Sequence, residues 1–162
     1  MTVEPSVGGC DTQEVGDDDY PAALRAILER AAVETRELRH GYIGSEHLLL
    51  ALFRGAGTRA AQRLEAAGGR YDDVYARIET IVGVGEDEVP EEQILPYTPN
   101  AAIIVRRVGD DAGRAGPEAI GTEHVLRAIL RLRDSLAVRI LKDCGVDIDS
   151  MAGQLRSARA DE

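Results

Sequence analysis

The sequence contains no tryptophan, one phenylalanine, one lysine and two cysteines in 162 residues, and aromatic residues make up only 4% of it. No apolar run approaches the 18 residues that a membrane-spanning helix needs, so no membrane association is expected. The N-terminus lacks the basic start and apolar core of a secretory signal. Cys10 and Cys144 provide neither a disulfide framework nor a metal-binding motif. These absences predict a cytoplasmic protein without a metal or other cofactor.

Basic residues are also scarce relative to acidic ones, which gives a formal net charge of −10. The excess is concentrated in residues 1–19, with six acidic and no basic residues, and in residues 83–96, with five acidic and no basic residues. Residues 20–82 and 97–162 are nearly neutral. Nucleic-acid binding needs clustered lysine and arginine, so this distribution argues against that function. It predicts a disordered acidic tail over 1–19 and an acidic linker over 83–96.

The two nearly neutral segments are related by an offset of 77 residues without a gap. Residues 43–47, Ile-Gly-Ser-Glu-His, align with residues 120–124, Ile-Gly-Thr-Glu-His. The same offset aligns Tyr20 with Tyr97 and Gly68 with Gly145. A constant offset and a shared five-residue block indicate an internal duplication. We therefore expect repeat 1 over residues 20–82 and repeat 2 over residues 97–159, both forming one domain.

Apolar residues recur at helical spacing four times in each repeat, and no segment alternates convincingly with a period of two. The pattern predicts an all-α fold of eight helices, arranged as two tandem four-helix repeats related by a pseudo-twofold axis. Hydroxyl residues precede several of the apolar runs and are predicted to be helix N-caps. They are Ser45, Thr58, Thr122 and Ser135. Pro99 fits the first turn of the helix that opens repeat 2.

The segment 39–52, Arg-His-Gly-Tyr-Ile-Gly-Ser-Glu-His-Leu-Leu-Leu-Ala-Leu, closely resembles the N-terminal repeat domain of the Clp ATPases, especially the ClpC type. In that family the block usually reads G-H-x-Y-I-G-T-E-H-L-L-L-A-L and occurs twice. Residues 96–99, Pro-Tyr-Thr-Pro, are similar to the family's aromatic-Thr-Pro start. The resemblance extends over residues 20–159. It implies a binding module whose partners are a Clp ATPase, its adaptors or its substrates.

The Clp ATPases also need a glycine-rich phosphate loop that ends in lysine and serine or threonine. The single lysine, Lys142, lies in a helical pattern with no such loop before it. No serine or cysteine is placed with histidine and aspartate as a nucleophile. We therefore expect a free-standing Clp N-domain that is not an enzyme and acts by binding.

Ser45 and Thr122, followed by Glu46 and Glu123, have two interpretations. A hydroxyl cap and a first-turn carboxylate stabilise a helix without any further role. The same geometry offers free N–H groups to a phosphate and a carboxylate to a guanidinium. In the Clp family the glutamate of this block is implicated in recognising phosphorylated arginine. The resemblance implies a phosphoarginine site at Ser45 with Glu46 and another at Thr122 with Glu123.

Tyr20 and Tyr97 begin the two repeats and also have two interpretations. They either close each repeat against its neighbour or, as the resemblance implies, bind cyclic-peptide antibiotics that target Clp N-domains. The second interpretation gives an alternative function, the sequestration of such compounds. His47 and His124 are expected to be satisfied histidines at helix starts, since a metal site needs three or four converging ligands. The residues before the second block, 116–119, lack the family's histidine and aromatic, so the two sites need not be equivalent.

Overall fold

The computed structural model describes residues 20–160, so the predicted disordered tail over 1–19 lies outside the described residues. Over that range the chain forms eight α-helices and one short 3₁₀ helix, which confirms the predicted all-α fold. The helices of repeat 1 are α1 (Ala22–Glu37), α2 (Ser45–Arg54), α3 (Arg59–Ala66) and α4 (Tyr71–Ile81). Those of repeat 2 are α5 (Pro99–Ala115), η3 (Pro117–Ala119), α6 (Thr122–Arg131), α7 (Leu136–Asp143) and α8 (Ile148–Ala160).

Local sequence explains where several helices begin. The hydroxyls of Thr58 and Ser135 accept hydrogen bonds from the backbone N–H groups three residues later, at 3.3 Å in both cases, so these two predicted N-caps are confirmed. Pro99 is the first residue of α5, as predicted, and Thr98 caps that helix. A proline suits this position because the first N–H groups of a helix have no intrahelical partner.

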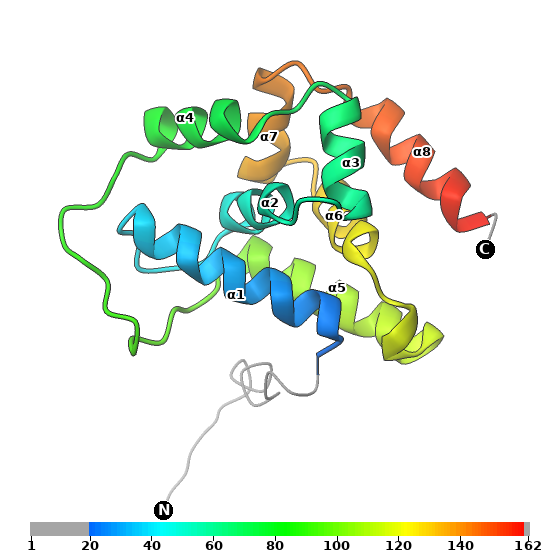
Figure 1. Ribbon diagram of the computed structural model, residues 1–162, viewed down its shortest axis with the longest axis horizontal. Coiled ribbons are helices and arrows are strands. Elements are labelled where there is room, and N and C mark those ends of the chain that lie inside the picture. The colour runs from blue at the N-terminus through cyan, green and yellow to red at the C-terminus, as the bar shows by residue number, and fades with distance from the viewer. Residues whose placement is uncertain (1–19, 161–162) are drawn as a thin grey trace, which may run out of the picture.

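The two repeats pack around the pair of central helices α2 and α6 (Figure 1). Helix α2 contacts α1 within its own repeat and α7 of the other repeat, while α6 contacts α5 and α3 in the corresponding way. Helices α3 and α7 therefore each cross to the opposite repeat, which is the arrangement expected for a pseudo-twofold axis. One continuous hydrophobic core includes residues from both repeats.

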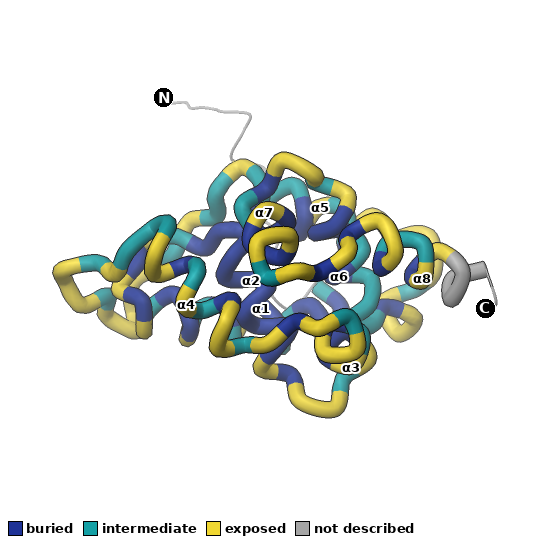
Figure 2. Tube along the Cα trace, turned by 90° about the horizontal axis from the view of Figure 1, so that it is seen from above, coloured by how far each residue is buried: buried dark blue, intermediate teal, exposed yellow. Residues whose placement is uncertain are grey.

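Helix α2 is the most enclosed element. All nine of its residues from 45 to 53 are buried, whereas the first three residues of α6 are only half-buried. Figure 2 shows buried residues at the centre of the molecule and exposed ones at its periphery. An apolar run such as residues 48–53 requires a helix surrounded by protein. The duplication has thus produced two central helices with unequal access to solvent.

The acidic linker over residues 83–96 is fixed to the C-terminal end of α1 through its backbone. The Arg36 guanidinium donates hydrogen bonds to the carbonyl oxygens of Pro90, Glu91 and Gln93, at 2.8–3.1 Å. The Gly85 N–H donates to the carbonyl of Leu38 at 2.9 Å. Because arginine bonds the backbone and not the carboxylates, all five acidic side chains of the linker stay exposed. In the part of the chain described, no helix has the length and apolar character to cross a membrane.

Candidate functional site

The duplicated block forms the N-termini of α2 and α6, where glycine and histidine provide the caps. Gly44 and Gly121 occupy the N-cap positions. The Gly44 N–H donates to Nδ1 of His47 at 2.9 Å, and the Gly121 N–H donates to Nδ1 of His124 at 3.0 Å. The prediction that Ser45 and Thr122 are the N-caps of these helices is therefore wrong. Each is the first helical residue, which places Glu46 and Glu123 second.

The two hydroxyls instead cap helices of the opposite repeat. Ser45 Oγ accepts a hydrogen bond from the Ala137 N–H at the start of α7, at 3.2 Å. Thr122 Oγ1 accepts one from the Ala60 N–H at the start of α3, at 3.1 Å. The two bonds are equivalent under the 77-residue offset. They satisfy N–H groups that have no intrahelical partner. The hydroxyl of each block therefore fastens one repeat to the other.

The two glutamates have different surroundings. Glu123 Oε2 accepts a hydrogen bond from Nε of Arg63, and Arg59 Nη1 lies 3.8 Å from Glu123 Oε1. Both arginines belong to α3 of the other repeat. The exposed side-chain fractions are 13% for Glu123, 27% for Arg63 and 76% for Arg59. The site is thus an ion-pair cluster accessible from solvent.

Glu46, by contrast, is only 4% exposed, and its carboxylate folds back over Gly44. Burial raises the pKa of the Glu46 carboxyl, while a hydrogen bond from its own backbone N–H and a positive charge on His40, present only when that ring takes up a second proton, act in the opposite direction. The positions equivalent to Arg59 and Arg63 are the apolar residues Leu136 and Ile140. The structure therefore gives the two predicted phosphoarginine sites different charge and different access.

Two histidines connect the start of α2 to the linker in repeat 1. His47 Nε2 lies 2.9 Å from His40 Nδ1, and His40 Nε2 lies 2.8 Å from the carbonyl oxygen of Gly83. The Gly83 carbonyl only accepts, so His40 carries its proton on Nε2 and its Nδ1 accepts from His47. Since His47 Nδ1 accepts from Gly44, both rings are neutral and the bonds run in one direction. The equivalent of His40 is Pro117, so this relay belongs to repeat 1 alone.

Tyr20 and Tyr97 are both half-buried and pack against the hydrophobic core. Tyr97 follows the linker, where an isolated parallel bridge joins it to Ile43. The bonds around this bridge run from the Ile43 N–H to the Pro96 carbonyl at 2.8 Å and from the Thr98 N–H to the Ile43 carbonyl at 2.9 Å. Both tyrosines thus retain a partly exposed surface next to the core.

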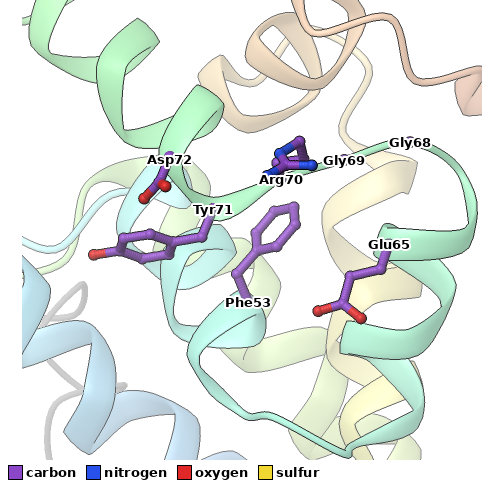
Figure 3. Close-up of a pocket in the computed structure, with 7 residues that line it drawn as sticks. All are labelled: Phe53, Glu65, Gly68, Gly69, Arg70, Tyr71 and Asp72. Carbon is purple, nitrogen blue, oxygen red and sulfur yellow. The ribbon is translucent and has the colours of Figure 1, made fainter.

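One cavity was not predicted from the sequence. It has a volume of about 450 Å³ and lies between the end of α3 and the start of α4, with the Phe53 ring forming part of its wall (Figure 3). None of the predicted site residues lines this cavity, whose walls include Gly69 and Tyr71. The available signal was a difference between the repeats, since Phe53 and Gly69 correspond to Leu130 and Val146. Among the described residues, no group of three or more histidine, cysteine, aspartate or glutamate side chains is placed to hold a metal ion.

The reciprocal caps predict a measurable loss of stability. Ser45→Ala and Thr122→Val each leave a backbone N–H of the opposite repeat without its partner, so each is expected to lower the free energy of unfolding by about 1–2 kcal/mol. Urea denaturation measures the change. Thr80→Val is the control, because Thr80 is exposed and its hydroxyl bonds the Ala76 carbonyl within the same helix. Unchanged stability in both cap variants contradicts the proposed fastening.

The buried relay predicts a dependence of stability on pH. Burial, reinforced by a positive charge on His40 when that ring takes up a second proton, lowers the pKa of His47 from 6.5 to about 3. Between these values the unfolded chain binds a proton that the folded chain excludes, so stability falls as the pH decreases from about 7 to about 3. The loss due to His47 is on the order of 4 kcal/mol. Glu46 offsets part of this loss, since its raised pKa favours proton uptake by the folded state.

His47→Gln keeps an acceptor for Gly44 but has no titrating group, so its stability should vary less with pH than that of the wild type. Urea denaturation at a series of pH values measures both slopes. His124→Gln is the control, because it makes the same change in repeat 2 and leaves His47 in place. Its free energy of unfolding should vary with pH as much as that of the wild type. Equal slopes for His47→Gln and the wild type contradict the prediction.

Comparison with known proteins identifies the family. A model of the Clp repeat N-terminal domain matches residues 20–144 and 97–161 of this chain. The protein ClpC/MecB of Bacillus subtilis, described as a negative regulator of genetic competence, is 32% identical over 136 residues, which are 84% of this chain and 16% of that protein. ClpC of Staphylococcus aureus is 32% identical over 132 residues, which are 82% of this chain and 16% of that protein. The chain thus spans about 16% of the length of these curated relatives.

Solved structures share the fold. The N-terminal domain of ClpD from Arabidopsis thaliana superimposes with a TM-score of 0.69 at 14% identity, covering 91% of this chain and 98% of that chain. The ClpV N-domain in complex with a VipB peptide superimposes with a TM-score of 0.60 at 17% identity, covering 94% of this chain and 91% of that chain. With the family model matching both repeats, the chain belongs to the Clp repeat N-terminal domain family.

Proposed function

We propose that this chain is a non-catalytic, cytoplasmic module of the Clp proteolysis system that binds protein segments. Its partners are substrates, adaptors or a Clp ATPase. The observation that carries the proposal is the accessible cluster of Glu123, Arg59 and Arg63, which joins α6 to α3 on a rigid helical scaffold. The ClpV N-domain supports it, since a protein with the same fold is in complex with a peptide.

The bound segments carry phosphoarginine as a mark for degradation. A phosphorylated guanidinium presents a cation and an anion side by side. The carboxylate of the duplicated block pairs with the cation, and donors at the neighbouring helix starts bind the phosphoryl oxygens. Thr122 with Glu123 forms one candidate site, and Ser45 with Glu46 occupies the equivalent position in repeat 1. In both blocks the hydroxyl holds the adjacent helix start in place by bonding its N–H group.

This proposal predicts that a peptide containing phosphoarginine binds the purified chain and that the same peptide with unmodified arginine binds more weakly. The double variant Glu46→Ala, Glu123→Ala should lose at least tenfold in affinity, because no carboxylate remains for the guanidinium. Isothermal titration calorimetry measures both. Glu79→Ala, which removes an exposed glutamate of α4, is the matched control. Absence of binding by the wild type removes the proposal.

Sequestration of cyclic-peptide antibiotics is the second candidate function. It is favoured by the partly exposed surfaces of Tyr20 and Tyr97 at equivalent positions beside the core. A chain that binds such compounds draws them away from a full-length Clp ATPase when it is abundant or binds more tightly.

The second candidate predicts heat of binding when a cyclic peptide of this class is titrated into the chain. Tyr97→Ala should weaken the binding at least tenfold, because it removes a large aromatic contact surface. Tyr75→Ala, which shortens a half-buried tyrosine of α4, serves as the control. No heat with the wild-type chain eliminates this function.

A further inference from the structure

We propose that only one of the two duplicated blocks binds a ligand, and that its arginines select ligands with an anionic group beside a cationic one. The working site consists of Thr122 and Glu123 from α6 with Arg59 and Arg63 from α3. This inference rests on the proposed function and deepens it, because it assigns the selectivity to α3, a helix of the other repeat.

The charges of the cluster are the first argument. Arg59 and Arg63 are four residues apart and therefore project from the same face of α3 toward one carboxylate. These three side chains carry two positive charges and one negative charge. An unmodified guanidinium adds a third positive charge to them. A phosphorylated guanidinium also brings a phosphoryl group with a charge of about −2 at neutral pH, which leaves the combined charge close to zero.

The existing ion pair is the second argument, because it acts as an internal competitor. Glu123 already accepts a hydrogen bond from the Arg63 guanidinium, so an incoming guanidinium must displace it. A ligand that offers only a guanidinium exchanges one such bond for another and leaves Arg63 without its carboxylate. A ligand with a phosphoryl group gives Arg59 and Arg63 a new anionic partner when they leave Glu123. Both arginine side chains reach solvent and have room to rearrange.

The first block lacks these features. In the first block the positions equivalent to Arg59 and Arg63 are Leu136 and Ile140 of α7. Helix α7 therefore supplies no guanidinium for a phosphoryl group there. Glu46 is buried, and the relay from His47 through His40 to Gly83 holds the linker against the same block. A ligand cation at Glu46 requires this arrangement to open. The geometry therefore assigns binding to the block at Thr122 and Glu123.

The test is isothermal titration calorimetry of the whole chain with three probes: free phosphoarginine, free arginine and inorganic phosphate. We expect one phosphoarginine per chain, with arginine and phosphate each at least tenfold weaker. Glu123→Gln alone should abolish the binding of phosphoarginine. Arg63→Gln should reduce the preference for phosphoarginine over arginine at least tenfold, since the internal competitor and one phosphoryl partner are lost. Thermal unfolding of each variant verifies that it is folded.

Arg139→Gln is the matched control. Arg139 is an exposed residue of α7 whose equivalent in repeat 1 is Gln62, so the variant removes the same charge at a position that already accepts glutamine. It should keep the wild-type preference. Two phosphoarginines per chain, or equal affinities for arginine and phosphoarginine, overturn this inference and leave the proposed function standing. Absence of phosphoarginine binding by the wild type overturns the proposed function itself.

Discussion

The hydrogen bonds from the Ala137 and Ala60 N–H groups to Ser45 and Thr122 determine how the two repeats fit together. A helix begins with N–H groups that no residue within the helix can satisfy. Helices α3 and α7 satisfy one of these groups with their own N-caps and a second with a hydroxyl of the other repeat. Since that hydroxyl belongs to the other repeat, the second bond exists only when the repeats are docked. The position of Arg63 beside Glu123 depends on the same docking.

The linker breaks the equivalence of the two blocks. It follows repeat 1, and its first residue, Gly83, accepts a hydrogen bond from His40. That bond ties the linker to the start of α2 and accompanies the burial of Glu46. Repeat 2 has Pro117 at the position of His40, and its block remains half-exposed. Duplication thus supplied two similar blocks, but one is enclosed by the segment that joins the repeats.

The sequence was informative wherever structure depends on neighbouring residues. Helical periodicity predicted the eight helices, and the hydroxyls of Thr58 and Ser135 marked helix starts because each bonds an N–H only three residues away. The same reasoning failed for Ser45. A serine before an apolar run gives the same sequence pattern whether its hydroxyl caps the helix that follows it or a helix elsewhere in the fold. Its partner is 92 residues away in the sequence. The partners of Thr122 and Glu123 are about 60 residues away, so no local pattern could reveal them.

A second carboxylate–guanidinium pair shows which features allow exchange of partners. Glu34 is buried, and its two oxygens accept hydrogen bonds from Arg54 Nε at 2.7 Å and from the Tyr71 hydroxyl at 2.5 Å. The Arg54 guanidinium also lies 4.7 Å from the centre of the Tyr71 ring. Removing Arg54 leaves the buried Glu34 carboxylate without its cation, which is costly, so the cluster serves the structure.

Glu123 differs in each of these respects. It is partly exposed, it faces two cations instead of one, and the outer cation, Arg59, lies mostly in solvent. An ion pair in such a position contributes little to stability, because water and salt compensate for its loss. We propose that a ligand replaces Arg63 at small cost to the fold, whereas displacing Arg54 leaves the buried Glu34 carboxylate without its cation. In this proposal the same pairing of charges stabilises the protein at Glu34 and permits recognition at Glu123.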